Sequence, residues 1–408
     1  MKNIQKTITR CLKTAKTLNS FKASEMVYKI NKNPTPLPEN FHTKEFLHDI
    51  TFGSLSTPHM LHIDWTDDGG WGKPRIEPFG PMVIPAAAGS LHYGMQVFEG
   101  MKAYYQKEKG QIVLFRPDMN AKRLINSSRA VALPTDIDID ELVECIRKLV
   151  EIDSAWVPED DSCSLYIRPT HIATNSHLGV APTDSSKIFV MLSPVGPYFK
   201  TGLQPVSLLA DPKYVRAWPG GTGQAKCGGN YGPTIPISTQ TMAETGCHQV
   251  LWLFNDGHEN GPLITEVGTM NFMCVWKRES DGKLELITPP LDEPEGSRKR
   301  DFILPGITRD SLLELARGWG EFEVSEKSIR WGEFRKALDE GRVVEAFGAG
   351  TACLVQPIGR FFDKTDGGEG VWIDVPTGDV YRKRFYDALV GIQSHGDKPP
   401  HENWVVKV

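Results

Sequence analysis

One lysine, Lys226, lies between two clusters of glycine in residues 220–233 (GGTGQAKCGGNYGP). Glycines are costly to order and have no side chain to pack, so a dense cluster indicates backbone that must approach something closely. A lysine in such a setting is a candidate nucleophile, because burial or a nearby cation lowers its pKa. The neutral amine can then form a Schiff base with a carbonyl cofactor. The alternative is a flexible surface loop with a solvated lysine.

Two further segments have the composition of anion sites. Residues 303–309 (ILPGITR) lead from a strand into a helix, so the free amide groups of Ile307 and Thr308 would favour a phosphate. Residues 346–352 (AFGAGTA) offer a second turn of small residues with a hydroxyl. Neither is a nucleotide signature, because the chain has no Walker A sequence and no Gly-x-Gly-x-x-Gly that opens a helix after a strand. Each segment alone can also be a plain turn.

Two strand-like segments carry charged side chains among apolar ones. Residues 263–271 (LITEVGTMN) place Glu266 between apolar neighbours, where a carboxylate needs a cationic or hydrogen-bonding partner such as a protonated pyridine nitrogen. Residues 164–169 (SLYIRP) place Tyr166 and Arg168 on one strand face, from which they can bind a carboxylate. A strand-end acid facing water and an ordinary half-exposed strand are the alternatives.

The eleven histidines predict no metal site. His59 and His62 stand three apart, but they follow Pro58 in a stretch without a helical signature, so core or solvated histidines are the better interpretation. A Gly-x-Ser-x-Gly elbow for a serine hydrolase is also absent from the sequence.

The composition is that of a globular protein long enough, at 408 residues, for two domains. A net charge of -5 gives no footprint for nucleic acid, and no window approaches the roughly 18 apolar residues of a membrane span. The seven cysteines are scattered without a Cys-x-x-Cys pair, which fits reduced thiols in an intracellular compartment.

The N-terminal residues 1–24 differ from the rest of the chain. They carry six lysines or arginines, several Ser and Thr, and no acidic residue. This composition predicts a mitochondrial transit peptide. The alternative is a disordered basic tail on a cytoplasmic protein.

The elements that must position these residues form a mixed α and β pattern in both halves of the chain. Residues 193–202 break all periodicity with two prolines and two glycines, so we place the interdomain linker at 194–202, between a small domain (25–193) and a large one (203–408). We expect helices at 140–152, 233–246, 308–318 and 331–341, and strands at 187–192, 249–254, 271–276 and 284–288. Ser311 and Glu314 have the spacing of a capping box.

Taken together, these segments resemble the branched-chain amino acid aminotransferases, which are pyridoxal 5′-phosphate (PLP) enzymes of fold type IV. The likeness runs from about Asp64 to the C-terminus. It rests on seven motifs in the family's order. They are residues 91–103 (LHYGMQVFEGMKA), 114–117 (LFRP), 164–169 (SLYIRP), the Lys226 segment, 265–271 (TEVGTMN), 304–309 (LPGITR) and 347–352 (FGAGTA). The resemblance implies an α+β fold like that of D-amino acid aminotransferase, with a small α/β domain and a larger domain built on a β-barrel-like sheet.

The resemblance also implies roles for individual residues. Lys226 is the Schiff-base lysine, Tyr231 donates a hydrogen bond to the phenolic oxygen of the cofactor, and Glu266 holds the pyridine nitrogen protonated. The other positions that match cofactor-binding residues are Arg123, Thr269, Ile307, Thr308 and Thr351. The positions that match the substrate pocket are Tyr93, Phe98, Tyr166, Thr269 and Ala352, with Arg168 for the second carboxylate of glutamate and Val180 supplied by the partner subunit of a homodimer.

The activity implied is the reversible, ping-pong transfer of the amino group of L-leucine, L-isoleucine or L-valine to 2-oxoglutarate, through PLP and pyridoxamine phosphate. One alternative is a D-amino acid aminotransferase or aminodeoxychorismate lyase, which share the lysine and the glutamate but not the LHY and SLYIRP contexts. Another is a phosphate-binding regulatory protein without covalent chemistry. The sequence departs from the family at 293–300, which looks like an insertion, and at Cys353, where Gln356 interrupts the Cys-x-x-Cys of the mammalian members.

Overall fold

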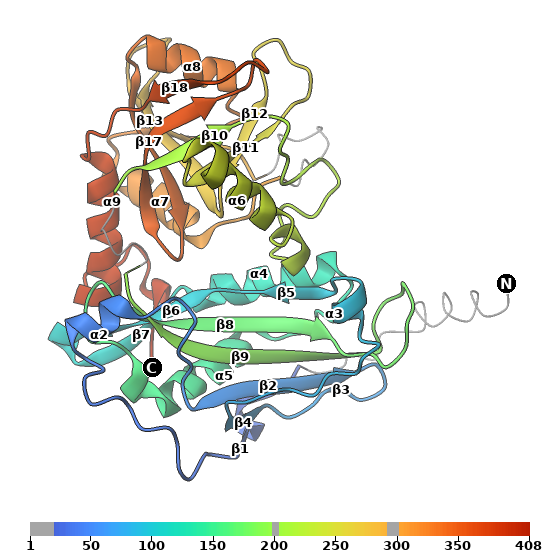
Figure 1. The fold of residues 1–408 in the computed structure, drawn as a ribbon. Coiled ribbons are helices and arrows are strands. Elements are labelled where there is room, and N and C mark those ends of the chain that lie inside the picture. Colours follow the sequence, from blue (N-terminus) through green and yellow to red (C-terminus); the bar gives the residue numbers. More distant parts are fainter. Residues whose placement is uncertain (1–19, 198–203, 292–301) are drawn as a thin grey trace.

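The computed structural model describes residues 20–197, 204–291 and 302–408 and arranges them around two β-sheets (Figure 1). Several predictions fall outside these ranges. They are the basic segment 1–24 apart from residues 20–24, the part of the predicted linker from 198 to 202, and the insertion at 293–300. None of the described helices is long and apolar enough to cross a membrane.

The first sheet has ten strands within the described residues, in the order β1-β4-β2-β9-β8-β6-β7-β19, with β3 beside β2 and β5 beside β8. Their bounds are β1 (Val27–Tyr28), β2 (His59–Thr66), β3 (Gly70–Trp71), β4 (Arg75–Pro78), β5 (Gln96–Phe98), β6 (Met101–Gln106), β7 (Gln111–Phe115), β8 (Ser164–Ala173), β9 (Ser185–Val195) and β19 (Val405–Lys407). The long antiparallel pair β8 and β9 forms its centre, with Arg168 opposite Met191.

The second sheet closes on itself. It has nine described strands in the order β12-β11-β10-β17-β16-β13-β14-β15, β18 pairs with β17, and a further pairing of β12 with β13 completes a ring of six strands. The bounds are β10 (Val206–Ala210), β11 (Gln249–Phe254), β12 (Leu263–Val267), β13 (Met270–Lys277), β14 (Leu284–Thr288), β15 (Glu323–Glu326), β16 (Val343–Gly350), β17 (Leu354–Asp363) and β18 (Val371–Asp374). The predicted barrel-like sheet is therefore confirmed.

Helices surround both sheets (Figure 1). They are α2 (Lys44–Asp49), α3 (Gly89–His92), α4 (Pro117–Ala130), α5 (Ile139–Ile152), α6 (Thr234–Thr245), α7 (Ile307–Trp319), α8 (Trp331–Asp339) and α9 (Tyr381–Val390). Single turns add η1 (Ala23–Glu25), η2 (Lys107–Lys109), η3 (Ser154–Trp156), η4 (Gly228–Asn230), a π turn η5 (Gly391–His395) and η6 (Glu402–Trp404).

The predicted helix at 140–152 is confirmed as α5, which starts because the Asp138 carboxylate accepts hydrogen bonds from the amides of Asp140 and Glu141. The helix at 233–246 is confirmed as α6, which ends at Gly246 in the left-handed conformation. Core histidines are confirmed too, because His59 and His62 are buried in β2 and His59 Nδ1 lies 2.7 Å from the carboxylate of Asp153.

The predicted helix at 308–318 is confirmed as α7 to within one residue at each end, but its cap differs from the prediction. The helix begins at Ile307 after the extended residue Gly306, and no side chain caps it. The Ser311 hydroxyl donates instead to the carbonyl of Ile307, one turn back within the helix. The predicted capping box at Ser311 and Glu314 is therefore wrong, and the first amides of α7 are left without a side-chain cap.

The two sheets are joined at more than one place. Strand β9 continues to Val195, beyond the predicted boundary at 193. Strand β19, from the C-terminal end of the chain, leaves the barrel and pairs with β7 through Val405 and Phe115. The Arg116 guanidinium lies 4.5 Å from the ring centre of Trp404, just before β19. This cation–π contact stabilises the packing of the C-terminal segment on the first sheet.

Candidate active site

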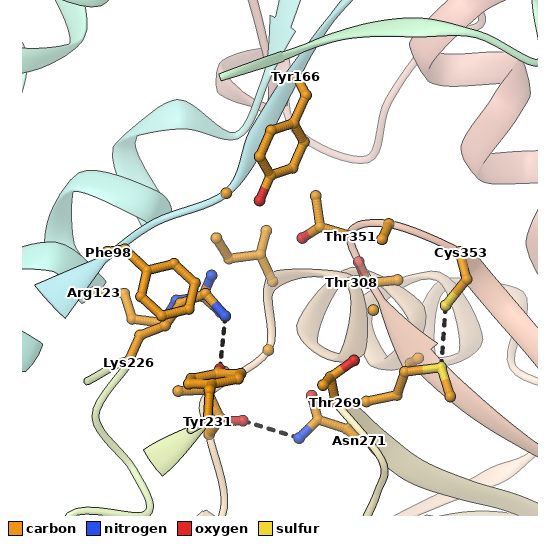
Figure 2. Close-up of a pocket in the computed structure, with 18 of the residues that line it drawn as sticks. Phe98, Arg123, Tyr166, Lys226, Tyr231, Thr269, Asn271, Thr308, Thr351 and Cys353 are labelled. Atoms are coloured by element: carbon orange, nitrogen blue, oxygen red, sulfur yellow. Dashed lines mark hydrogen bonds between the residues drawn. The ribbon is translucent and has the colours of Figure 1, made fainter. Parts of the chain in front are cut away.

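A cavity of about 450 Å³ lies between the two sheets (Figure 2). The first sheet and its helices contribute Phe98, Gly100, Arg123, Tyr166 and Arg168 to its lining, and the barrel side contributes Thr269, Met270, Asn271, Ile307, Thr308, Ala349, Gly350, Thr351, Ala352 and Cys353. Lys226 and Tyr231 enter from the loop between β10 and α6. Most of the residues that the sequence suggested for chemistry therefore meet in one place.

Lys226 is held at the wall of this cavity by its backbone. Its carbonyl accepts from the amide of Phe98 at 3.0 Å, and its amide donates to the Ser127 hydroxyl at 2.8 Å. The Nζ atom donates to the Tyr231 hydroxyl at 2.8 Å and lies 4.7 Å from the ring centre of Phe98. Burial, with a contribution from the Arg123 cation, lowers the pKa of Lys226 to about 7. A large fraction of this amine is thus neutral and nucleophilic near pH 7.

Glu266 lies in β12, directly behind the cavity wall. One of its carboxylate oxygens accepts from the Leu304 amide at 2.8 Å and from the Asn271 side-chain amide at 3.3 Å. The other oxygen forms a 2.7 Å ion pair with Arg216, and both side chains are about 5% exposed. Burial raises the pKa of Glu266, and the Arg216 cation opposes that rise. The strand-end acid facing water is therefore excluded by the burial of this side chain.

The start of α7 and the β16–β17 turn form one end of the cavity. Thr308 in the first turn of α7 and Thr351 between the two strands line the same end of the cavity, across from Lys226 (Figure 2). A Cβ atom at Gly306 would collide with the side-chain oxygen of Asn271, so only glycine lets the chain enter α7 here. The positive end of the helix dipole and two hydroxyls favour an anion at this end.

Arg123 lines the same end but is also tied to the protein. Its Nε donates to the buried carboxylate of Glu99 at 2.7 Å, and its Nη1 donates to the Pro305 carbonyl at 2.9 Å. Since Pro305 precedes the start of α7, this arginine fixes the position of the helix terminus relative to α4. Its charge adds to the electropositive character of the anion-favouring end.

Aromatic side chains form the other end of the cavity. Tyr166 and Arg168 share one face of β8 as predicted, and Arg168 Nη2 donates to the Tyr166 hydroxyl at 2.8 Å. The Arg168 guanidinium also lies 4.8 Å from the ring centre of Phe98, and Phe52 packs on Tyr166 with ring centres 4.8 Å apart. Apolar surface with one cation suits a substrate that carries an aliphatic chain or a carboxylate.

Two of the residues suggested for the substrate pocket are not among those lining the cavity. Tyr93 follows α3 and is 42% exposed, and Val180 lies in the loop between β8 and β9 and is 89% exposed. Both side chains are therefore free to meet another molecule, which for Val180 is what the resemblance implies.

The structure adds three residues that the sequence analysis did not single out. Arg216 pairs with Glu266, Glu99 pairs with Arg123, and Phe52 lines the cavity beside Tyr166. Glu99 lies in the LHYGMQVFEGMKA motif, where an acidic residue among apolar neighbours was a usable signal. Arg216 and Phe52 lie outside all seven motifs, and only the fold brings them to the site.

A lysine amine of lowered pKa, placed between a closed barrel and a second sheet and facing a helix terminus, is the site of a lysine-dependent enzyme. The chain belongs to the class IV aminotransferases, because the family model for amino-transferase class IV matches residues 96–361. The resemblance noted from the seven motifs is confirmed at this level.

Within this family, the chain is similar to proteins named as branched-chain-amino-acid aminotransferases. The chain is 43% identical over 394 residues to the mitochondrial branched-chain-amino-acid aminotransferase of Rattus norvegicus, which covers 96% of this chain and 93% of the relative. It is 50% identical over 311 residues to the branched-chain-amino-acid aminotransferase of Monosiga brevicollis, covering 76% of each. Among solved structures, the branched-chain amino acid aminotransferase of Escherichia coli matches with a TM-score of 0.62 and 25% identity, over 84% of this chain and 98% of that one.

Proposed function

We propose that this protein is a PLP-dependent branched-chain amino acid aminotransferase, which transfers the amino group of L-leucine, L-isoleucine or L-valine reversibly to 2-oxoglutarate. The observation that carries the proposal is the Lys226 amine, with a pKa of about 7, in a cavity that has an anion-favouring end and an aromatic end. Relatives at 43% to 50% identity that bear this name support the substrate class.

The residues present fit the cofactor. PLP has an aldehyde, a phenolic oxygen, a pyridine nitrogen and a phosphate, and the cavity together with Glu266 directly behind its wall offers a chemical partner for each. Lys226 provides the amine, Tyr231 a hydroxyl that burial keeps protonated, and Glu266 a buried carboxylate. The start of α7 with Thr308, and Thr351 across from it, would hold the phosphate.

When bound, PLP supplies an electron sink that stabilises the negative charge left on the substrate when its Cα proton departs. Lys226 Nζ is the base for that proton, since its lowered pKa lets it accept at neutral pH and return the proton in the next step. Glu266, which is paired with Arg216 and accepts from the Leu304 amide, would be the partner of the protonated ring nitrogen. Arg123 and its partner Glu99 hold the helix terminus that would bind the phosphate.

The aromatic end of the cavity selects the substrate. Phe98, Tyr166 and Phe52 provide apolar surface for a branched aliphatic side chain. Arg168, at hydrogen-bond distance from the Tyr166 hydroxyl, is the cation for the second carboxylate of 2-oxoglutarate and glutamate. Thr269 and Ala352 line the same space and complete the group of residues assigned to the substrate.

The test is the visible absorption spectrum of the purified protein with PLP, recorded before and after L-leucine and again after 2-oxoglutarate. We expect a visible band that falls with L-leucine and returns with the oxo acid. Lys226→Ala should abolish this cycle, whereas Lys213→Ala, which removes an exposed lysine, should leave it intact.

Two results of this test would contradict the proposal. A band that responds to D-leucine but not to L-leucine would support a D-amino acid aminotransferase instead. A protein whose Lys226→Ala variant binds PLP with an unchanged spectrum would support a phosphate-binding protein without covalent chemistry.

We further infer a homodimer. Val180 (89% exposed), Leu178 (63%) and Leu91 (62%) carry large apolar surfaces near the ends of β8 and α3, as does Tyr93. Such surfaces are normally covered by a partner, and a second copy would bring Val180 of the partner subunit toward the substrate. Light scattering of the wild type and of Val180→Asp tests this: we expect a dimer weakened by the substitution, and a monomeric wild type would contradict it.

We also infer import into mitochondria from the basic, acid-free segment 1–24. Relatives named as mitochondrial in Rattus norvegicus, Mus musculus and Bos taurus support this location, and others named as cytosolic leave the cytoplasm as the alternative. Fusing residues 1–24 to a fluorescent reporter distinguishes the two, because only a transit peptide carries the reporter into mitochondria.

A further inference from the structure

A second cavity, of about 310 Å³, lies behind the β16–β17 turn. It is lined from the first sheet by Lys102 and Tyr104 on β6, from the segment before β8 by Asp161, Ser162 and Cys163, and from α9 and the turn after it by Tyr386, Val390, Gln393 and Ser394. Ala352 and Cys353 line both this cavity and the candidate active site. The two spaces are therefore separated by a single turn of the chain.

Lys102 is the cation of this second cavity. Its Nζ donates to the carbonyl of Ala352 at 3.1 Å, which is its one hydrogen bond to the described residues. An ammonium has three donors, so two remain for another partner. No carboxylate of the described chain lies within 4.0 Å of this nitrogen. Burial lowers the pKa of Lys102 to about 8, so the amine is still mostly protonated at pH 7.

The other titratable groups around Lys102 do not neutralise it. Burial raises the pKa of the Cys163 and Cys353 thiols to about 12, so both are uncharged. Burial also raises the pKa of Tyr104 and of Tyr386. Neither phenol is ionised at pH 7.

The acidic side chains of this region have other partners. Asp161 lines the cavity, but its carboxylate lies 3.1 Å from His395 Nε2. Asp160 lies 3.7 Å from Nε2 of His48, which also lines the cavity. Lys102, which is only partly buried, therefore presents its charge to the cavity without a carboxylate partner among the described residues, and an anion there would pair with it.

We propose that this second cavity binds a small monocarboxylate, with its carboxylate on Lys102 and its apolar body against Val390, Leu354 and Tyr386. One cation matches one negative charge, which favours a carboxylate over a phosphate dianion. The volume suits a ligand of few atoms, and Leu354, Tyr386 and Val390 give the lining an apolar part next to polar side chains such as Ser162 and Gln393.

The bound carboxylate would act on the active site through the shared turn. Lys102 holds the Ala352 carbonyl, and Ala352 and the adjacent Thr351 line the first cavity. An anion that draws the ammonium away would loosen this turn, so occupancy of the second cavity should weaken substrate binding in the first. This coupling rests on the proposed function, whereas the binding itself does not.

The experiment uses 4-bromobenzoate, an unreactive monocarboxylate, with the full-length protein loaded with PLP. Anomalous diffraction from bromine locates the ligand in soaked crystals, and calorimetry with L-leucine present measures binding when the active site is occupied. We expect bromine in the cavity of Lys102 and saturable binding in solution. Lys102→Met should weaken binding about 10- to 100-fold, the loss of one charge-assisted hydrogen bond. Lys102→Arg, which keeps the charge, and Lys107→Met, an exposed lysine next to the same strand, should retain it.

Several outcomes overturn the proposal. They are a bromine peak in the candidate active site alone, binding at crystal concentration only, and equal affinity of the wild type and Lys102→Met for 4-bromobenzoate. Should Lys102→Met fail to fold, the bromine position in the wild type still decides the question. A bromine peak beside Lys102 in a protein without transaminase activity would refute the proposed function and leave the second site standing. Inhibition by 4-bromobenzoate that is unchanged in Lys102→Met would refute the coupling.

Discussion

The lowered pKa of Lys226 should be visible in the stability of the cofactor-free protein. The unfolded chain titrates this amine near its usual 10.5, whereas the folded chain titrates it at about 7. Below pH 7 both states carry the proton, and the folded state bears the full cost of the buried charge. At about 1.4 kcal/mol per pKa unit, a difference of about 3.5 units amounts to about 5 kcal/mol.

The pH dependence follows from the same two values. Between pH 7 and pH 10.5 the unfolded chain holds the proton and the folded chain does not, so stability rises with pH by about 1.4 kcal/mol per unit. Lys226→Met removes this titration. We expect the variant to be more stable than the wild type at pH 7, and its advantage to shrink by about 2.3 kcal/mol by pH 9, because the folded amine is half protonated at pH 7.

The assay is urea unfolding of both cofactor-free proteins at pH 7, 8 and 9, followed by tryptophan fluorescence at one fixed protein concentration. Taking the difference between variant and wild type at each pH cancels the titration of all other groups. Lys107→Met, at an exposed position, serves as the control and should give a difference that does not vary with pH. A constant difference for Lys226→Met would show that this amine titrates alike in both states and would refute the reasoning.

Three further predictions concern groups around the site. Arg216→Met should slow the spectral response to L-leucine at least tenfold, because it leaves the Glu266 carboxylate buried without its countercharge, and Arg216→Lys should restore part of the rate in stopped-flow measurements. Gly306→Ala should weaken PLP binding at least tenfold in a spectrophotometric titration, because its Cβ collides with Asn271 and displaces the start of α7; unchanged affinity would contradict the assignment of that terminus. Asp138→Ala should lower the free energy of unfolding by about 1 kcal/mol without changing the spectral cycle, through loss of the α5 cap.

Local patterns in the sequence predicted the features that depend on nearby residues. The apolar face and cap of α5 are encoded within one segment, as is the proximity of Lys226 to Tyr231 within a single loop. The burial of Glu266 followed from its apolar neighbours in β12. The order of the seven motifs then predicted, through the resemblance to a family, that their residues line one cavity.

Features that depend on distant parts of the chain were not accessible in this way. The partner of Glu266 is Arg216, which belongs to a loop without periodicity, so only the folded barrel pairs them. The predicted start of α7 was right to within one residue, but the spacing of Ser311 and Glu314 wrongly suggested a capping box, and the close approach of Asn271 to Gly306 could not be read from the sequence. Nothing in the sequence of β6 distinguishes Lys102 from an ordinary lysine. It lacks a carboxylate partner because of the side chains that surround it from the segment before β8, from the β16–β17 turn and from α9.

The pairing of β19 with β7 has a consequence for the order in which the protein matures on the ribosome. Val405 pairs with Phe115, yet every strand of the barrel lies between them in the chain. Strand β7 therefore lacks its partner strand β19 while the whole barrel segment is being synthesised. An unpaired strand edge can form hydrogen bonds with strands of other chains. On this edge, residues 113–115 of β7 are paired only when the chain has returned from the barrel, and the short strand β19, made late in synthesis, then becomes the edge of the sheet begun first.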